Sequence, residues 1–517
     1  MDPGRPLCQG DGTSPLEVRI MTKPLHLLLG PLLLALPLSL ALNPGQTARA
    51  QPLPALVTDA ALAKKLASVL SDSRVTRGTV GVVVAESSSG AELYRRSATT
   101  AISPASNMKL VTAAAALDLL GPGHTFSTDA YAPAAPVNGV VSKLYLKGNG
   151  DPTLREADLR ALATQVKAAG ITKVTGGVVG DGGYFDSDLY NNYWDPDDYN
   201  NSYAAQISGL TLSPSSAYAV GTVQVTYQPG SGKGKKAKLG LVPALAAGYV
   251  KLVNKTTTTS AGSGASISVR RSNHTNTITV SGRVALKRSL VKRTVTISNP
   301  ARYAAHVFTR VLRAAGVDVP ASPTTGSTPT VRVQVASDTS VPLSTIVTLL
   351  MKPSNNGMTE HLAKTLGRVG TKAGTWKAGA AVIRTWLAKT QSVPSTVVLV
   401  DGSGLAHRNK LTARVLVRLL QYAQTRPWFD TFYNALPVAG NPDPAIGGTL
   451  TDRMVGTAAA NNLHAKTGTL SGITALSGYV TDRSGRRYTF SMLGKYSGSS
   501  PRIVFDKVGA TLAGWTS

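Results

Sequence analysis

The sequence predicts an α/β (α+β) fold that carries a large, β-rich inserted region. Helix-like and strand-like segments intermix along most of the 517 residues, which is typical of this fold class. Between residues 129 and 330 the pattern changes to short β-like runs separated by Gly, Ser, Thr and Pro. At about 150 residues per domain the length allows two to four domains with ample core. We expect a catalytic part and an inserted region of two subdomains, with these bounds: 51–128 and 331–517 for the catalytic part, 129–215 with 296–330 for the first subdomain, and 216–295 for the second.

The spacing of apolar residues predicts the individual elements. One helix is expected to begin with Ser103 as its N-cap and Pro104 at its first position, and to end at Gly121. The other expected helices cover 62–70, 301–315, 344–351, 358–366, 411–425 and 503–515. Strands are expected over 79–84, 93–94, 331–335, 396–400, 476–481 and 487–493.

Charge and cysteine content narrow the possible functions. The chain has 54 Lys and Arg against 27 Asp and Glu, a net charge of +27 that favours contact with a polyanion. From Tyr199 to Val317 there are 16 Lys and Arg and no acidic residue. The single cysteine, Cys8, excludes a disulfide scaffold and an iron–sulfur cluster. No histidine pattern indicates a metal site, so we expect neither a metal nor a cofactor.

The beginning of the chain has the layout of a secretory signal peptide. Lys23 precedes an apolar run over 25–42, and the small-x-small site Ala48-Arg49-Ala50 follows, which predicts cleavage near Gln51. We interpret residues 1–20 as an extension upstream of a start at Met21. A membrane-spanning helix is the alternative, but glycine and prolines interrupt the run, and no later segment is long and apolar enough to span a bilayer. Export makes an anionic cell-wall polymer a better candidate partner than nucleic acid.

The first chemical motif is Ser106-x-x-Lys109. On a helix, residues three apart share a face, so the hydroxyl and the amine can form a hydrogen bond. A lysine whose pKa is lowered by burial can activate a serine nucleophile. The spacing alone is weak, because Ser289-x-x-Lys292 repeats it in a basic, strand-like stretch with no helix start.

Two further motifs follow in the chain. Ser354-Asn355-Asn356 offers a hydroxyl and an amide just before a helix, where a simple N-cap is the alternative interpretation. Lys466-Thr467-Gly468-Thr469 places a cation and hydroxyls beside a strand, where they could hold a carboxylate, and its glycine allows close approach of a substrate backbone. In this order the three motifs match S-x-x-K, S-x-N and K-T-G, the signature of penicillin-interacting serine enzymes.

With these motifs the chain resembles the class C low-molecular-mass penicillin-binding proteins, the D-alanyl-D-alanine carboxypeptidase/endopeptidase family. The segments G-N-G-D-P-T-L at 148–154, A-A-Q-I-S at 204–208, D-G-S-G-L at 401–405 and L-P-V-A-G at 436–440 are also similar to that family. The 248 positions from Ser106 to Ser354 (354 minus 106) leave room for the family's insertion. The resemblance covers nearly all of residues 55–517 and implies a β-lactamase/transpeptidase-like domain.

The resemblance also implies a role for each motif residue. Ser106 would be the nucleophile that forms the acyl-enzyme, with Lys109 as general base. Ser354 and Asn356 would relay protons and hold the substrate amide, and Lys466 would set the electrostatics around Ser354. The hydroxyls of Thr467 and Thr469, beside Gly468, would bind the terminal carboxylate of the substrate, and the N–H groups of Ser106 and Thr469 would form the oxyanion hole.

One segment departs from the family pattern. Where the family usually continues D-G-S-G-L-S-R, this chain has Ala406-His407-Arg408. His407 and Arg408 are therefore candidate substrate-binding residues, and Asp197 or Asp198, near Trp194, could hold an amine of the substrate. A solvated loop is the alternative interpretation of the two aspartates.

These observations predict an exported serine D-alanyl-D-alanine carboxypeptidase that acts on peptidoglycan stem peptides and is inhibited covalently by β-lactams. An additional endopeptidase activity stays open. A β-lactamase of related fold is one alternative, although the acylation glutamate of class A enzymes has no convincing candidate, with Glu360 just after the second motif. A catalytically silent, wall-binding protein is the other alternative.

Overall fold

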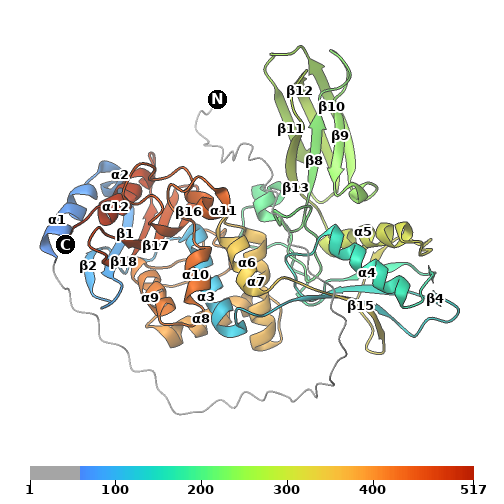
Figure 1. Cartoon of the computed structure of the whole chain (residues 1–517), viewed down its shortest axis with the longest axis horizontal. Helices are drawn as coiled ribbons and strands as arrows, with labels where there is room; N and C mark the ends of the chain where they lie inside the picture. Colours follow the sequence, from blue (N-terminus) through green and yellow to red (C-terminus); the bar gives the residue numbers. More distant parts are fainter. Residues whose placement is uncertain (1–58, 517) are drawn as a thin grey trace. The chain divides into compact units, whose positions relative to one another are not determined.

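A five-stranded antiparallel sheet lies at the centre of the catalytic part in the computed structural model, which describes residues 59–516 (Figure 1). The strand order is β16-β17-β18-β1-β2, so strands from the two ends of the chain lie side by side. The predicted signal peptide lies outside the described residues. The strands are β1 (Thr79–Glu86), β2 (Glu92–Arg96), β16 (His464–Leu470), β17 (Ile473–Thr481) and β18 (Arg487–Lys495).

Helices cover both faces of this sheet. Along β17, Leu476 and Val480 pack with helices α1 (Ala60–Val69) and α12 (Arg502–Ala513), whereas Ala475 and Tyr479 face a larger cluster of helices on the other side. Successive side chains of a strand point to opposite faces, so a strand covered on both faces is apolar throughout. This explains the uninterrupted apolar run at Val82–Val84 in β1.

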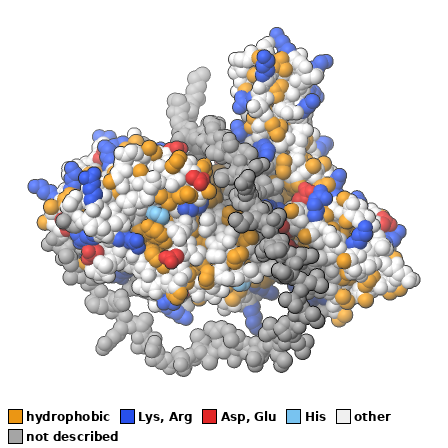
Figure 2. All heavy atoms as spheres, in the orientation of Figure 1, with side chains coloured by type: hydrophobic (Ala, Val, Ile, Leu, Met, Phe, Trp, Pro, Cys, Tyr) orange, Lys and Arg blue, Asp and Glu red, His pale blue; other side chains and the backbone are white. Residues whose placement is uncertain are grey.

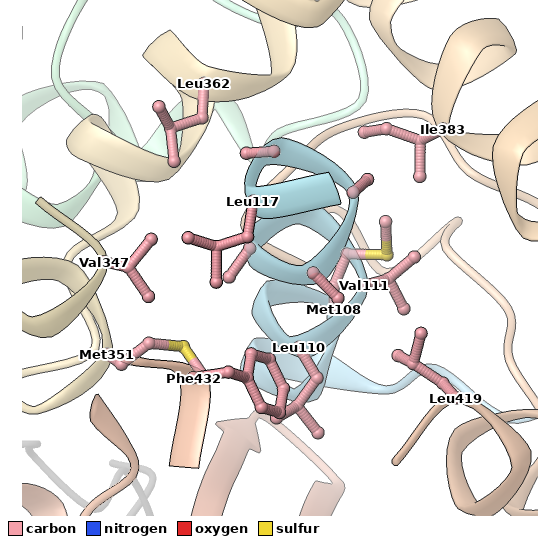
Figure 3. Packing of buried hydrophobic residues seen from close by; sticks show 14 of the residues in the cluster. Met108, Leu110, Val111, Leu117, Val347, Met351, Leu362, Ile383, Leu419 and Phe432 are labelled. Atoms are coloured by element: carbon pink, nitrogen blue, oxygen red, sulfur yellow. The ribbon is translucent and has the colours of Figure 1, made fainter. Parts of the chain in front are cut away.

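Helix α3 (Met108–Leu120) is the centre of the larger helical cluster. Its first ten residues, Met108–Leu117, are all buried, because neighbouring helices surround it. Figure 3 shows Val347, Ile383 and Leu419, from three different helices, lying around α3. The surrounding helices are α6 (Leu343–Met351), α7 (Asn356–Thr371), α8 (Trp376–Thr390), α9 (Ala413–Gln424) and α10 (Phe429–Ala435).

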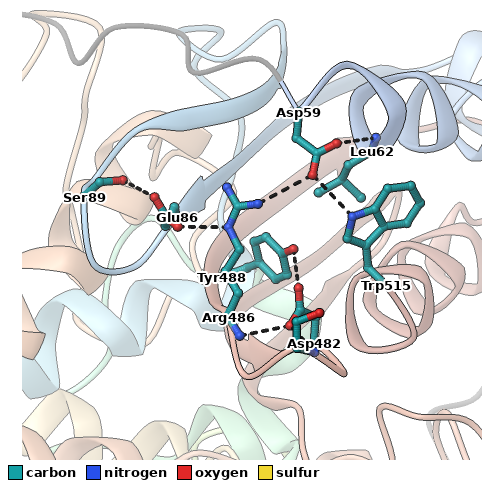
Figure 4. A network of polar contacts seen from close by, with 9 residues as sticks. Asp59, Leu62, Glu86, Ser89, Asp482, Arg486, Tyr488 and Trp515 are labelled. Carbon is teal, nitrogen blue, oxygen red and sulfur yellow. Dashed lines mark hydrogen bonds and ion pairs between the residues drawn. The ribbon is translucent and has the colours of Figure 1, made fainter. Parts of the chain in front are cut away.

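A polar network fastens the first and last helices to the sheet (Figure 4). Arg486 donates to Glu86 Oε1 at 2.9 Å and pairs with the Asp59 carboxylate at 3.5 Å. Asp59 caps α1 and also accepts from Trp515 Nε1 at 3.3 Å. The network thus joins α1, the β17–β18 turn and the C-terminal segment.

A second five-stranded sheet, of order β14-β7-β5-β3-β15, forms the core of the inserted region together with helices α4 (Glu156–Ala168) and α5 (Pro300–Ala314). Strand β15 pairs with β3 and runs to Thr339, so this sheet extends past the expected boundaries at 129 and 330. The strands are β3 (Ser127–Ala132), β5 (Leu144–Gly148), β7 (Val178–Asp181), β14 (Thr324–Thr325) and β15 (Val333–Thr339).

Two three-stranded sheets, of order β13-β8-β9 and β10-β12-β11, occupy the stretch that was expected to be a basic, β-rich subdomain. Tyr227 of β8 and Val284 of β12 are buried together with Ala237, the residue before β9. Figure 2 shows Lys and Arg side chains over the surface of these strands. The strands are β8 (Thr222–Gln228), β9 (Lys238–Val242), β10 (Lys251–Thr259), β11 (Ser266–Arg271), β12 (Thr277–Ala285) and β13 (Val291–Thr296).

Short elements complete the described chain. They are α2 (Ser73–Thr76), α11 (Pro444–Gly447), the paired strands β4 (Val140–Val141) and β6 (Lys173–Val174), and the 3₁₀ turns η1 (Ala105–Asn107), η2 (Pro196–Asn200), η3 (Ser202–Ala204), η4 (Ala244–Ala246) and η5 (Gly448–Leu450). Among residues 59–516, the helices are too short or too polar to cross a membrane.

Two local predictions were wrong. Ser103 does not cap the helix: its buried hydroxyl has no hydrogen-bond partner among the described residues, and a 3₁₀ turn precedes α3 instead. The run 396–400 is not a strand, because it makes only an isolated bridge between Val398 and Lys410. Gly121 ends α3 with a φ of 84°, as predicted.

Candidate active site

Ser106 and Lys109 lie at the junction of the 3₁₀ turn η1 and helix α3. Lys109 Nζ is 2.9 Å from Ser106 Oγ, 2.6 Å from Asn356 Oδ1 and 2.9 Å from the Ser403 carbonyl oxygen. Lys109 is fully buried, whereas Ser106 is partly exposed. A buried amine therefore lies behind a hydroxyl that a ligand can reach.

The turn that presents Ser106 has unusual backbone geometry. Ala105 adopts a φ of 45°, which costs a residue with a Cβ free energy that the surrounding packing must offset. The Ala105 carbonyl lies so close to Gly404, at φ 83°, that any Cβ there would collide with it. Gly404 thus allows the 401–405 segment to pack directly against the nucleophile turn.

The second motif begins helix α7. Asn355, not Ser354, is its N-cap, and its side chain accepts from Met358 N at 3.1 Å. Ser354 has a φ of 61°, a second strained position at this site. The Asn356 amide has fixed orientation, because its oxygen accepts from Lys109 and its nitrogen donates to the Tyr203 carbonyl at 2.9 Å.

The third motif lies on β16, the edge strand of the central sheet. Lys466 Nζ donates to Ser354 Oγ at 2.9 Å, so the second and third motifs are in contact. Asn107 Nδ2 donates to the Lys466 carbonyl at 3.0 Å, which joins β16 to the nucleophile turn. A Cβ at Gly468 would lie 2.8 Å from the Pro104 carbonyl, so a larger residue would push the strand away.

Burial controls the electrostatics of both lysines. Desolvation lowers the pKa of Lys109 to about 7, although the charges of Glu360 and Asp401 oppose this shift. Burial also lowers the pKa of Lys466 well below its usual value, and the nearby cation of Lys109 adds to the effect. Near neutral pH, Lys109 therefore exists partly as a free amine that can accept a proton from Ser106.

The model of the D-Ala-D-Ala carboxypeptidase 3 (S13) family matches residues 62–512, which include all three motifs. The chain belongs to this family. Membership confirms the predicted enzyme class, a serine-type D-alanyl-D-alanine carboxypeptidase, and the resemblance to the low-molecular-mass penicillin-binding proteins.

One curated relative and one solved structure are similar to this chain over most of its length. The chain is 40% identical to a D-alanyl-D-alanine carboxypeptidase of Actinomadura sp. strain R39 over 457 residues, 87% of this chain and 84% of the relative. It is similar to the crystal structure of penicillin-binding protein 4 from Haemophilus influenzae, with a TM-score of 0.72, 21% identity, and coverage of 86% and 98% of the two chains. That likeness confirms the predicted fold.

The remaining predicted residues of this S13 chain differ in their surroundings. Thr467 is nearly buried and its hydroxyl lies 2.7 Å from that of Thr449, whereas Thr469 is exposed. His407 and Arg408 are exposed, and the Arg408 guanidinium lies 4.7 Å from the centre of the Tyr193 ring.

The two candidate aspartates lie in the 3₁₀ turn η2. Asp197 is exposed, and its backbone N–H donates to Asp195. Asp198 accepts from the hydroxyl of Tyr203, the residue whose carbonyl accepts from Asn356. The aspartate loop is thus linked to the second motif, while a contact with substrate stays a prediction. Within residues 59–516, no group of three or more His, Cys, Asp or Glu side chains could hold a metal ion.

Several residues of the site were not predicted from the sequence. Asn107, Tyr203 and Ser403 contribute through an amide and two backbone carbonyls, which leave no signal in a motif. Glu360 was noticed only as a poor match to another enzyme class. Its position four residues after Asn356 on a helix was the available signal, because residues four apart share a face.

Proposed function

We propose that this chain hydrolyses the terminal D-alanine from peptidoglycan stem peptides through an acyl-enzyme on Ser106. The observation that carries this proposal is the position of Lys109 Nζ, which contacts both Ser106 Oγ and Asn356 Oδ1 inside a buried cluster. A base with a pKa near the working pH, within hydrogen-bond distance of a hydroxyl, is the arrangement that serine acylation requires.

In the first half of the reaction, Ser106 Oγ attacks the carbonyl carbon of the penultimate D-alanine and Lys109 takes the hydroxyl proton. The backbone N–H groups of Ser106 and Thr469 stabilise the resulting oxyanion, a contribution of roughly 3–4 kcal/mol per donor in other enzymes. Asn356 holds the substrate amide, and Thr467 with Thr469 holds the terminal carboxylate. The Ser354–Lys466 pair, joined at 2.9 Å, delivers a proton to the leaving amine and takes up the proton held by Lys109, so Lys109 is a free amine again once the acyl-enzyme has formed.

In the second half, a water molecule attacks the ester carbonyl and Lys109 again accepts the proton. The peptide shortened by one residue leaves, and Ser106 regains its hydroxyl. A β-lactam, whose amide and carboxylate imitate the substrate, acylates the same oxygen and acts as a covalent inhibitor. A structure of the Haemophilus influenzae penicillin-binding protein 4 holds a β-lactam, which agrees with this ligand class.

We propose further that the chain acts outside the cytoplasm after export and that its basic strands contact anionic wall polymers. The signal-like segment 21–50 supports export. Twelve exposed cations on or between the strands of 222–296 support the contact with a polyanion: Lys233, Lys235, Lys236, Lys238, Lys251, Lys255, Arg270, Arg283, Lys287, Arg288, Lys292 and Arg293. We propose no nucleic-acid partner.

The test combines a defined stem peptide ending in D-Ala-D-Ala with a fluorescent penicillin. We expect release of one D-alanine per peptide and a penicillin adduct whose mass maps to the peptide that contains Ser106. Cross-linked muropeptides in the same assay measure the endopeptidase activity. An adduct that persists in Ser106→Ala contradicts the mechanism, and sustained turnover of a chromogenic cephalosporin favours a β-lactamase.

A further inference from the structure

Glu360 is a buried carboxylate at the site that the mechanism above does not use. It lies on α7, is inaccessible to solvent, and accepts three hydrogen bonds. The donors are Ser403 N at 2.7 Å, Gly402 N at 3.0 Å and Trp376 Nε1 at 2.7 Å. Two successive backbone N–H groups of one loop thus point at one side chain.

The same loop supplies an acceptor to the proposed base. The Ser403 carbonyl accepts from Lys109 Nζ at 2.9 Å, and the Gly402 carbonyl accepts from Thr112 Oγ1 at 2.7 Å. Glu360 thus accepts from the N–H groups of residues 402–403, whereas side chains of α3 donate to their carbonyl groups. A Cβ at Gly402 would lie 2.6 Å from Ala363 Cβ, so the loop packs against α7 with no space for a shift.

Charged groups approach this cluster from several elements. Asp401, buried in the loop itself, accepts from Trp194 Nε1 at 3.0 Å and from three further donors: Gly404 N, Ala406 N and Asn409 Nδ2. Lys364, one turn after Glu360 on α7, pairs with Asp186 at 2.6 Å. Lys466 faces Lys109 from β16. Glu360 and Asp401 are thus the two carboxylates whose charge acts on Lys109.

We propose that Glu360 is a positioning residue for acylation: it holds the 402–404 loop so that Ser403 fixes Lys109, and it places a negative charge behind the base. This inference rests on the proposed role of Lys109 at Ser106. Its chemical consequence follows from Coulomb attraction, because a carboxylate near a buried amine stabilises the protonated amine. Burial and the charge of Asp401 raise the pKa of Glu360 above its usual value, while its three N–H donors favour the charged carboxylate.

Asp118 provides a matched control on the same helix as Lys109. Its carboxylate also accepts from aromatic donors, Trp386 Nε1 and Trp428 Nε1, both at 2.8 Å, but it belongs to a separate network that ends at Arg426. Replacing Asp118 by Asn removes a partly buried carboxylate that also accepts from two indoles, without touching the loop that contacts Lys109. A purely structural role for Glu360 predicts the same behaviour in both variants.

The experiment measures the second-order rate of acylation by penicillin against pH for the full chain and for Glu360→Gln and Asp118→Asn. In the parent we expect a rate that rises with pH as Lys109 loses its proton. In Glu360→Gln the lost negative charge moves this rise to lower pH by on the order of one unit, and the plateau rate falls as the loop loosens. Asp118→Asn keeps the parent profile while its melting temperature falls.

A Glu360→Gln profile that rises at the same pH as the parent overturns the inference. If that variant does not fold, Trp376→Phe replaces it, because loss of the indole donor favours protonated Glu360 and must shift the profile in the same direction by a smaller amount. Absence of any shift in Trp376→Phe then overturns it. Failure of the parent to form an adduct overturns the proposed function instead, so the two failures are distinguishable.

Discussion

Two Ser-x-x-Lys tetrapeptides occur in this chain, and their surroundings differ completely. Ser106 and Lys109 lie on a helical turn, 2.9 Å apart, with the lysine fully buried. Ser289 and Lys292 lie before and within strand β13, and both are exposed. Lys109 of the first pair contacts Asn356 of the second motif and the Ser403 carbonyl, whereas the second pair belongs to a basic surface.

The difference shows what the spacing can and cannot predict. Residues three apart share a face on a helix, but in a strand successive residues point to opposite faces, so residues three apart do not share one. The chemistry depends further on burial, which lowers the pKa of Lys109 to about 7. The spacing alone therefore does not predict the site, and the helix start and the burial of Lys109 distinguish the first pair from the second.

The largest expected effect is the loss of acylation rate on replacing Lys109, with the same replacement at Lys292 as the control. Lys109→Met removes the proposed base and should lower the rate of penicillin acylation by about 10²–10⁴-fold, the usual contribution of general base catalysis. Lys292→Met should leave that rate unchanged within about twofold, because an exposed residue outside the site supplies no interaction to the transition state. Stopped-flow or quench labelling measures both rates. Equal losses of acylation rate in the two variants would contradict the proposal that Lys109 has a catalytic role that Lys292 lacks.

The next effect concerns the packing that keeps the first pair in place. Gly404→Ala puts a Cβ 1.8 Å from the Ala105 carbonyl and imposes a φ of 83° on alanine. We expect the free energy of unfolding to fall by on the order of 2–3 kcal/mol, with a slower acylation rate, because the nucleophile turn must move. Thermal unfolding and labelling measure the two quantities. Gly485→Ala, at a similar φ of 85° but with open space around it, is the control for backbone strain alone.

The sequence predicted the parts of the fold that depend on local patterns. The apolar run of β1, the C-terminal stop at Gly121 and the late strands β17 and β18 follow from periodicity and turn chemistry. Helices α4, α8 and α10 were missed: α4 lies in a region that otherwise consists of short β-like runs, and α8 contains a glycine that weakens the helical signal. The Ser103 cap failed because tertiary contacts, including Ala105 against Gly404, impose a 3₁₀ turn there.

The candidate site was predictable to the extent that its residues belong to motifs. Lys109, Asn356 and Lys466 are brought together as expected, by contacts that span 247 positions between Lys109 and Asn356. The backbone acceptors at Tyr203 and Ser403 were not predictable, because every residue has a carbonyl and only the fold decides which one meets an amine. Glu360 has a side chain of the right chemistry, but its partners come from distant loops.

A smaller effect is expected from pH, which changes the acylation rate through the protonation of Lys109. If Lys109 acts as a free amine, the acylation rate falls about tenfold per pH unit below a pKa of about 7, and reaches a plateau above it. The sign follows from burial, which disfavours the charged ammonium and so lowers the pKa from 10.5. A pH series of penicillin labelling, with the melting temperature recorded at each pH to exclude unfolding, measures this dependence. A rise centred near pH 10 would contradict the activation of Lys109 by burial.

The smallest effect belongs to the second pair and its basic surroundings. Lys292 and Arg293 are exposed on β13, with Lys287 and Arg288 just before it, and no acidic residue occurs from Tyr199 to Val317. Reversing the charge of Lys292 and Arg293 with Glu should weaken binding to purified, polymer-bearing cell wall by roughly twofold to fivefold at low salt, and by less at high salt, because exposed charges are screened. Co-sedimentation with cell wall measures binding, and penicillin labelling of the same variant checks that the Ser106 site is unchanged. If wall binding is the same at low and high salt, the basic strands do not act as an electrostatic surface.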